Sequence, residues 1–401
     1  MSAAQWRKAM NSGAGRQGWT RSGASSSPSS GQFAGSESAT TASRNANGRA
    51  LTADGLPDYS DQDAPRWLKW LWQRVSTRHV LVLLAVLLYP MVANPFFVFQ
   101  VGAQTMALGL IALSLTFLGG YGGMISLSQL TIAGVAGYML AIFGSSAVQS
   151  ISLNWPWWLA VLLAIMIATA LATFIGWLSV RTEGIYTIMI TLAIGVAFYY
   201  LVLQNYTIFN GFQGFSKVHP PHLFDIDWRS PLPFYYLTAT MAMLGYFFVK
   251  YLLRAPFGVA LQGVRDNPRR MNALGFNVVA HRVAAHAVAG LIAAVGGILL
   301  IWYNGLIAPG SVSSSTLINV LIIAVLGGMR HPIGPFIGAL VFVLLQNFAV
   351  DIVSRERFNL LIGGVFLAIV LFSPDGLLGL WEKFRNRFSQ PSQQSKLRST
   401  H

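Results

Sequence analysis

The sequence predicts an all-α polytopic membrane protein with about 8–10 transmembrane helices, some re-entrant or broken, behind a disordered N-terminal tail. Only 10% of its 401 residues are charged, 54% are hydrophobic, and the mean hydropathy is +0.54. A soluble domain carries about 25% charged residues, so this chain has too few charges to cover a water-exposed surface. The composition therefore argues against a soluble enzyme. The chain contains no cysteine, which excludes disulfides, thiol catalysis and cysteine-bound metal.

Residues 1–62 are rich in Ser, Gly, Ala and Asn and contain no apolar run. Such a segment cannot bury enough surface to offset its ordering entropy, so we expect a disordered cytoplasmic tail. Its basic start is not followed by an apolar core, so we do not expect a signal peptide. Residues 63–78 place tryptophan and basic residues at helical spacing, which predicts an amphipathic helix in the bilayer interface. A plain lead-in to the first span is the alternative.

Residues 79–380 form the predicted transmembrane domain, in which apolar segments recur with short breaks. A span needs about 20 apolar residues. Tryptophan and tyrosine gather near the segment ends, as in the aromatic belts of membrane proteins. The first and eighth segments are short, which predicts tilted, re-entrant or protein-buried helices. The candidate spans are 79–94, 97–118, 124–144, 157–180, 185–204, 233–253, 282–303, 316–329, 333–350 and 358–374.

The distribution of charge predicts the orientation. With the N-terminus in the cytoplasm, these spans leave only four of the 27 Lys and Arg residues in outside loops. This asymmetry satisfies the positive-inside rule, so we expect both termini in the cytoplasm, including a basic tail at 381–401. The net charge of +14 is then explained by membrane orientation. We therefore expect membrane lipid, and no nucleic acid, as a partner.

The predicted spans lack the residues of an energised carrier. No Asp, Glu, Lys or Arg lies clearly inside a span, since Glu183 and Asp375 lie at span ends. Proton-coupled carriers usually keep ionisable residues at membrane depth, which disfavours a secondary carrier and an intramembrane hydrolase. The chain has no GxxxxGK[ST] motif, so we do not expect it to hydrolyse ATP in that way. It is predicted to be no enzyme and to transport either passively or with a separate motor protein.

The outside loop 205–232 contains residue types that bind metals, namely His219, His222, Asp225 and Asp227. Two prolines separate the histidines, so no helix can present both on one face. We interpret the segment as a surface loop able to receive a soluble partner. Neither a metal nor another cofactor is expected.

Paired glycines interrupt two apolar runs, FLGGYGGMISLSQ at 117–129 and VLGGMRHPIGPFIG at 325–338. Glycine lets the backbone unwind beside a cavity, so we interpret both segments as borders of a translocation path. Close helix packing is the competing interpretation. The candidate path residues are Gly120, Gly122, Ser126, Ser128, Gln129, Gly327, Gly328 and Gly334.

The inside loop 254–282 reads RAPFGVALQGVRDNPRRMNALGFNVVAHR. Asn267 suits a helix N-cap, Pro268 the first helical position and Gly275 the position after the helix end. These signals predict a helix of about two turns, which is too short to be stable alone in water. It must dock on something: its own bundle, lipid head groups, or a cytoplasmic motor. A motor fits best with a chain that lacks its own energy source.

Five ordered segments carry a family resemblance: GGYGGMISLSQ, RTEGIYTIMITLAIG, APFGVALQGVRDNPRRMNALGFN, AVLGGMRHPIGPFIGA and LFSPDGLLGLW. They span roughly residues 80–382, and the chain resembles the LivM-type permease subunit of branched-chain amino acid ABC importers of the bacterial inner membrane. The resemblance implies a second, LivH-type permease subunit, two ATP-binding cassette subunits and a periplasmic solute-binding protein. It also implies that the cytoplasmic loop couples to the ATPase. By match, the coupling residues are Arg265, Asp266, Asn267, Pro268, Arg269, Arg270, Ala273, Leu274 and Gly275.

The resemblance also bounds the substrate. Similar permeases serve branched-chain amino acids, urea, short amides and aromatic acids. We expect branched-chain or other hydrophobic amino acids, with urea or short amides as the alternative. A passive channel would need no docking loop, and a secondary carrier would need buried charge. The loop departs from the family pattern at Pro268, where an acidic residue is common, and at Arg270 and Met271, where alanines are common.

Overall fold

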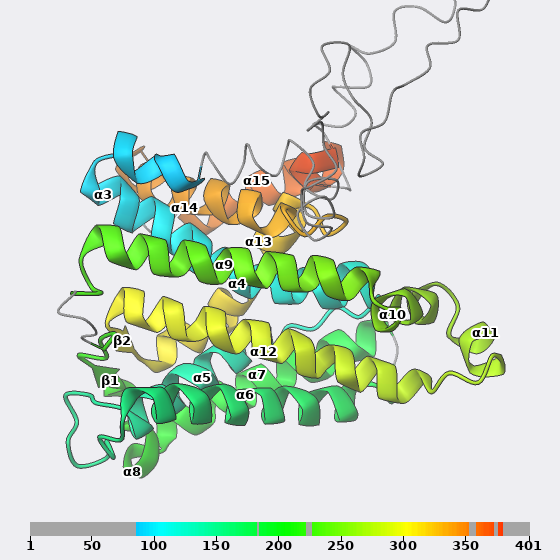
Figure 1. Ribbon diagram of the computed structural model, residues 1–401, viewed down its shortest axis with the longest axis horizontal. Coiled ribbons are helices and arrows are strands. Elements are labelled where there is room, and N and C mark those ends of the chain that lie inside the picture. The colour runs from blue at the N-terminus through cyan, green and yellow to red at the C-terminus, as the bar shows by residue number, and fades with distance from the viewer. Residues whose placement is uncertain (1–85, 183, 222–226, 353–357, 373–375, 380–401) are drawn as a thin grey trace, which may run out of the picture. The chain divides into compact units, whose positions relative to one another are not determined.

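The computed structural model describes residues 86–182, 184–221, 227–352, 358–372 and 376–379 (Figure 1). The predicted tails 1–62 and 381–401 and the predicted interfacial helix 63–78 lie outside these ranges. The described residues are overwhelmingly helical, and their strands are two-residue pieces. The prediction of an all-α membrane protein is confirmed.

Five helices are long and apolar enough to cross a bilayer within the described residues. The first runs continuously over Pro95–Tyr121 and contains two π-helical segments. A span of about 20 residues at 1.5 Å per residue matches the hydrocarbon thickness, which is why these segments are helical throughout. The elements of the first helix are α3 (Pro95–Phe97), η1 (Val98–Ala103), α4 (Gln104–Thr116) and η2 (Phe117–Tyr121). The other four are α6 (Trp157–Ser179), α7 (Ile185–Gln204), α9 (Pro231–Arg254) and α12 (Val278–Asn304).

The remaining apolar helices are shorter. They are α5 (Gln129–Phe143), α13 (Ser314–Gly327), α14 (Gly334–Ile352) and α15 (Phe358–Phe372), and residues 86–92 are also helical. The sequence placed the third span at 124–144, but helix α5 begins only at Gln129. Residues 124–128 are not helical, so the chain turns back after η2 before it enters α5. This is the broken membrane segment that the glycines predicted.

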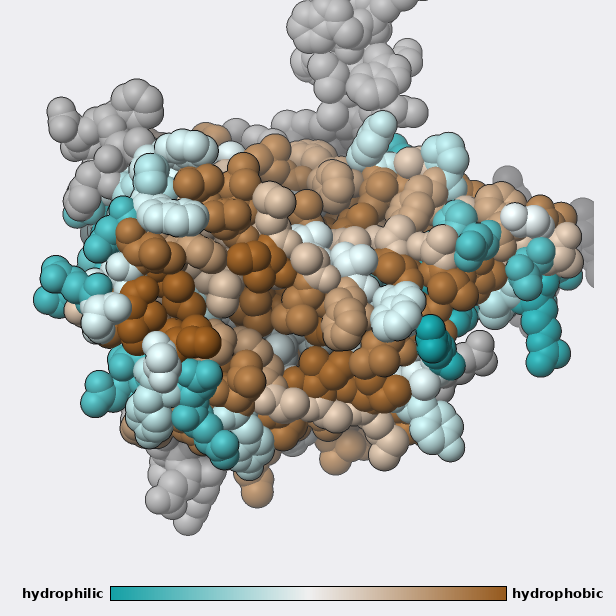
Figure 2. All heavy atoms as spheres, turned by 90° about the horizontal axis from the view of Figure 1, so that it is seen from below, coloured by the Kyte–Doolittle hydropathy of each residue, from teal (hydrophilic) through white to brown (hydrophobic). Residues whose placement is uncertain are grey.

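The surface of the described residues suits a lipid environment. On the face shown in Figure 2, apolar side chains cover the middle, and polar ones gather towards the two ends. Helix α6 contributes large exposed side chains such as Trp158, Met166 and Phe174, each more than half exposed. Large apolar side chains exposed to water would be an aggregation site, whereas lipid tails solvate them.

The core is built by close packing of small residues. One face of α6 repeats alanine every fourth residue, at Ala160, Ala164, Ala168 and Ala172, and all four are fully buried. Because residues four apart lie on one face of a helix, these alanines form a shallow groove. Gly290 of α12 lies against Ala172, with no room for a Cβ. Small residues let membrane helices approach until their backbones touch.

Short elements occupy the two ends of the described bundle, as Figure 1 shows. At one end lie α8 (Tyr206–Phe209), η3 (Gly211–Gln213) and η4 (Pro309–Val312). Strands β1 (Phe215–Ser216) and β2 (Leu306–Ile307) pair there as an antiparallel ribbon, with Phe215 opposite Ile307. At the other end lie α10 (Pro256–Asp266) and α11 (Pro268–Ala273). The predicted outside loop and the predicted coupling loop thus lie at opposite ends.

The contact between α12 and α5 gives a test of the packing. A Cβ on Gly297 would lie only 2.6 Å from the Cα of Ala133. We expect Gly297→Val to lower stability by about 1–3 kcal/mol through overpacking, measured as a lower thermal midpoint in detergent. Gly363→Val is the matched control, since nothing lies within 4 Å of a Cβ on Gly363. An equal midpoint for the two variants would contradict the packing.

Candidate functional site

Helix α11 forms where the cap signals predicted it. The Asn267 side chain accepts a hydrogen bond from the Arg270 backbone N–H at 2.9 Å, and Pro268 occupies the first position. Gly275 has φ of +87°, a conformation that glycine adopts without strain. The backbone N–H of Phe276 donates to Met271 O at 3.1 Å, which closes the helix end. A second asparagine, Asn277, caps α12 by accepting from Ala280 N.

Helix α11 and the turn after it present an open apolar surface. None of the α11 residues is buried. Leu274 is 66% exposed, Val279 52% and Phe276 40%. Phe276 and Val279 line a shallow pocket of about 390 Å³, together with Asn272, Gly275, Asn277 and Val278. A six-residue helix that packs Met271 against Gly263 of α10 but fully buries none of its residues needs another surface for stability.

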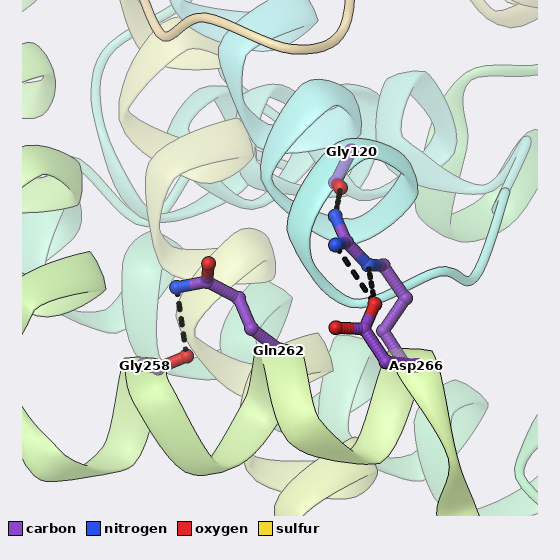
Figure 3. A network of polar contacts seen from close by, with 5 residues as sticks. Gly120, Gly258, Gln262 and Asp266 are labelled. Atoms are coloured by element: carbon purple, nitrogen blue, oxygen red, sulfur yellow. Dashed lines mark hydrogen bonds and ion pairs between the residues drawn. The ribbon is translucent and has the colours of Figure 1, made fainter.

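Arg265 occupies a different position from the other loop arginines. Arg269 and Arg270 belong to α11, whereas Arg265 ends α10 and turns towards the bundle. Its Nη1 donates to the backbone oxygen of Gly120 at 2.6 Å (Figure 3). Its Nε and Nη2 contact the Asp266 carboxylate at 2.9 Å. The family match put all three arginines among the coupling residues, and the structure gives Arg265 a hydrogen bond that links α10 to η2.

Gly123 provides the space for this link. Its φ is +68°, and a Cβ there would lie 2.5 Å from Cγ of Arg265. Any side chain at position 123 would therefore be strained and would displace Arg265. On α10, Gln262 donates to Gly258 O at 3.1 Å, within the helix that carries Arg265 (Figure 3).

The two glycine segments meet at this same end. A Cβ on Gly120 would overlap the backbone oxygen of Met329. The Tyr121 hydroxyl donates to Arg330 O at 2.7 Å. The sequence analysis did not select Tyr121, Met329 or Arg330, although all three lie inside the two glycine motifs. Candidate path residues and candidate coupling residues thus form one connected structure, joined through Gly120.

The glycines of the second segment are explained by helix packing. Gly327 of α13 and Gly334 of α14 approach so closely that a Cβ on either would overlap backbone of the other helix. Gly338, one turn along α14, is held against the Ile323 carbonyl in the same way. Gly328 ends α13 with φ of +101°. These contacts are those of close helix packing, and the role of these glycines at the border of a path stays a prediction.

The polar residues of the first segment are buried. Ser126, Ser128 and Gln129 are at most 1% exposed. The hydroxyls of Ser126 and Ser128 lie 2.8 Å apart, and Ser114 Oγ of α4 donates to Gln129 Oε1 at 3.2 Å. Ser114 lies seven residues before Tyr121, so residues 124–128 return about two turns into the bundle. Gly122, whose N–H donates to Phe117 O at 3.2 Å, starts this return.

The backbone of the returning segment is tied to α7. The Leu127 N–H donates to Thr191 Oγ1 at 3.1 Å, and Thr191 in turn donates to Thr187 O at 3.0 Å. Irregular backbone at membrane depth is tolerated only where protein or water satisfies its polar groups. Thr191 satisfies one of them by accepting the hydrogen bond of the Leu127 N–H. Sequence reasoning missed Ser114 and Thr191, because isolated hydroxyls in apolar helices are common.

Residues with metal-binding chemistry stay apart within the described part of the chain, where no group of three His, Cys, Asp or Glu side chains forms. His219 contacts Arg229 Nη1, at 2.7 Å from its Nε2. His222 and Asp225 lie outside the described residues. His281 stacks on Phe257, and His286 faces Gly176.

The described residues form apolar helices long enough to cross a bilayer, a broken membrane segment and the exposed helix α11 at one end. These are the features of a polytopic membrane transport protein. The chain belongs to the family described as the permease component of branched-chain amino acid transport systems, whose model matches residues 97–370. The match covers every described helix from η1 to α14 and most of α15.

Similar curated proteins are transport permeases. The chain is 26% identical to the high-affinity branched-chain amino acid transport system permease protein LivM of Salmonella typhimurium, over 76% of each chain. It is 25% identical to LivM of Escherichia coli, again over 76% of each chain. A shorter stretch, 29% of this chain and 35% of its relative, is 31% identical to the nucleoside ABC transporter permease protein NupC of Lactococcus lactis. No solved structure gave a significant match.

The link between Arg265 and Gly120 gives a test of the site geometry. We expect Arg265→Gln to free the 119–123 turn, because a charged hydrogen bond of this kind contributes about 1–3 kcal/mol. Faster amide hydrogen exchange in peptides covering 117–125 would show the loss. Arg269→Gln, which removes an exposed charge on α11, is the control and should leave that exchange unchanged. Equal exchange in both variants would count against the link.

Proposed function

We propose that this chain is one transmembrane permease subunit of an ABC importer for branched-chain or other hydrophobic amino acids. The observation that carries the proposal is α11, a capped helix with an open apolar surface at the end of the bundle. Such a helix suits a docking site for a separate ATPase subunit. The relatives named LivM support the substrate class, since their printed function is branched-chain amino acid transport.

The proposed coupling runs from α11 into the bundle through α10. Movement of α11 on an ATPase would move α10, because only Asn267 separates the two helices. Arg265 would pass that movement to Gly120 through its 2.6 Å hydrogen bond. Gly120 precedes the returning segment with Ser126, Ser128 and Gln129, so the buried polar residues would shift with it. In this proposal Arg269, Arg270 and Leu274 contact the ATPase. Arg265 transmits the movement of α10 to Gly120.

The proposed complex contains a second, LivH-type permease subunit, two ATP-binding cassette subunits and a periplasmic solute-binding protein. The probable branched-chain amino acid transport permease protein LivH of Methanocaldococcus jannaschii is 24% identical to this chain, over 37% of this chain and 49% of the LivH protein. The end that carries α8, η3 and the β1–β2 ribbon would receive the binding protein. No comparison names urea or amide transport, so that alternative has no support beyond the resemblance.

The coupling proposal predicts a separation of ATP hydrolysis from uptake. We expect the double variant Arg269→Glu and Arg270→Glu to lower leucine uptake at least tenfold, because two charge reversals lie on the docking surface. Assembly of the permease in the membrane should stay normal, since neither side chain is buried. Uptake of radiolabelled leucine and ATP hydrolysis are measured on the reconstituted transporter. Excess urea and acetamide serve as competitors that test the alternative substrates.

Arg181→Glu is the control for this experiment, since Arg181 is an exposed arginine between α6 and α7, outside α10 and α11. It should leave the coupling of hydrolysis to uptake intact. Unchanged uptake in the α11 double variant would exclude α11 as the docking site. Competition by urea but not by valine would redirect the substrate assignment.

The proposed orientation has both termini in the cytoplasm and β1 outside. The chain has no cysteine, so an introduced single cysteine is the only thiol that a labelling reagent can modify. In intact spheroplasts, an impermeant maleimide should label Ser216→Cys, an exposed position of β1, and spare Ser389→Cys. Permeabilised cells are the control, in which both variants should react. The reverse pattern in intact spheroplasts would invert the whole topology.

A further inference from the structure

Helix α5 carries buried polar atoms that have no hydrogen-bond partner among the described residues. They are Gln129 Nε2, Thr131 Oγ1 and Tyr138 OH. Thr131 and Tyr138 are fully buried, and Gln129 is 1% exposed. A buried polar group without a partner destabilises the folded state, and lipid supplies no replacement. Such a group stays available to hydrogen-bond a molecule that reaches it.

Two of these groups lie on the same face of α5. Thr131 and Tyr138 are seven residues apart, which is about two helical turns. A Cβ on Gly195 of α7 would lie 3.0 Å from Thr131 Oγ1. The ring of Tyr138 makes an edge contact with Phe198 of α7, with centroids 6.2 Å apart. Both unpartnered hydroxyl residues therefore border α7. We define Thr131, Tyr138, Gly195 and Phe198 as the α5–α7 seam.

The seam adjoins the returning segment at one end and an aromatic cluster at the other. Thr191, one turn before Gly195, accepts the Leu127 N–H at 3.1 Å. Beyond Phe198, the Tyr138 ring also makes edge contacts with Phe209 of α8 and Phe215 of β1. The seam thus runs from the broken membrane segment towards the end of the bundle that carries the β1–β2 ribbon.

Helix α7 buries little of its surface within the subunit. Only 22% of its most apolar window is buried within the subunit, against 67% for α12. Its buried residues are Thr187, Thr191, Gly195 and Val202, so the face turned inward is narrow and small. A helix that buries so little can move away from α5 at low cost. The seam can therefore open to admit a small molecule.

We infer that the α5–α7 seam is a binding site for the transported solute, which is a small molecule of zero net charge with an apolar side chain. A hydroxyl both donates and accepts, so Thr131 and Tyr138 can bond a carboxylate as well as an ammonium group. Phe198 supplies an apolar contact. Leu317 supplies another, since its Cδ1 would lie 2.9 Å from a Cβ on Gly195. This inference rests on the proposed transport function and names where the solute binds.

The charge of the seam limits the solute. Helices α5 and α7 contain no Asp, Glu, Lys or Arg between 129–143 and 185–204. A solute with net charge would therefore enter without a counter-charge, which is costly at membrane depth. A zwitterionic aliphatic amino acid carries its own counter-charge and meets this limit.

Removal of single oxygens tests the site with little change of shape. We expect Thr131→Val and Tyr138→Phe each to lower leucine uptake about three- to tenfold in the reconstituted transporter, as the loss of one hydrogen bond predicts. ATP hydrolysis and thermal stability should not fall, because each variant removes an unpartnered hydroxyl. Thr169→Val is the matched control, since Thr169 Oγ1 of α6 is also buried and unpartnered but lies outside the seam. Full uptake in both seam variants would overturn the inference.

A second measurement does not depend on the identity of the solute. The chain has no cysteine, so Thr131→Cys introduces a single thiol. A small, water-soluble thiosulfonate should modify it during ATP hydrolysis and not at rest, and leucine should slow the modification. A thiol that stays unmodified in both states would overturn the inference. Absence of leucine uptake by the unaltered transporter would instead reject the proposed function, and modification during hydrolysis would still support the seam.

Discussion

Contact between helix backbones at small residues holds the described bundle together. In lipid the hydrophobic effect does not drive one apolar helix onto another, so association depends on close packing. Gly297 brings α12 against the backbone of Ala133, and Gly290 brings it against Ala172. With α12 fixed between α5 and α6, the ends of the helices have defined positions. The link from Arg265 to Gly120 is possible only because those ends are fixed.

The same packing divides the described residues into fixed and movable parts. α4 and α12 are largely buried and resist change, since overpacking costs energy at every turn. Helix α7 and the exposed helix α11 bury less of their surface. Solute binding is proposed beside α7 and coupling through α11, and the two roles join at Leu127 and Gly120.

Much of the fold could be predicted because lipid leaves few choices for the backbone. Helices α6 and α7 coincide with their predicted spans to within a residue. Helix α11 was equally predictable, because Asn267, Pro268 and Gly275 carry their conformational preferences locally. The convergence of the site was not predictable, since Arg265 and Gly120 are 145 residues apart and Tyr121 and Arg330 are 209 apart. A glycine in the sequence is compatible with both a packing contact and an unwound segment. Only the residues that lie next to it in the structure show which of the two it forms.

The shortness of α13 has a consequence for permeation. Its 14 residues cover about 21 Å, whereas the hydrocarbon layer is about 30 Å thick. Its last turn, before Gly328, adjoins Met329 and Gly120 at the same end of the bundle as α10, so α13 falls short at its Ser314 end, where Val312 of η4 packs against Gly134 of α5 and protein surrounds the chain. Water entering from that side would meet polar backbone well before the midplane. The dehydrated stretch that a solute crosses is then thinner than the membrane, and the barrier to its passage falls accordingly.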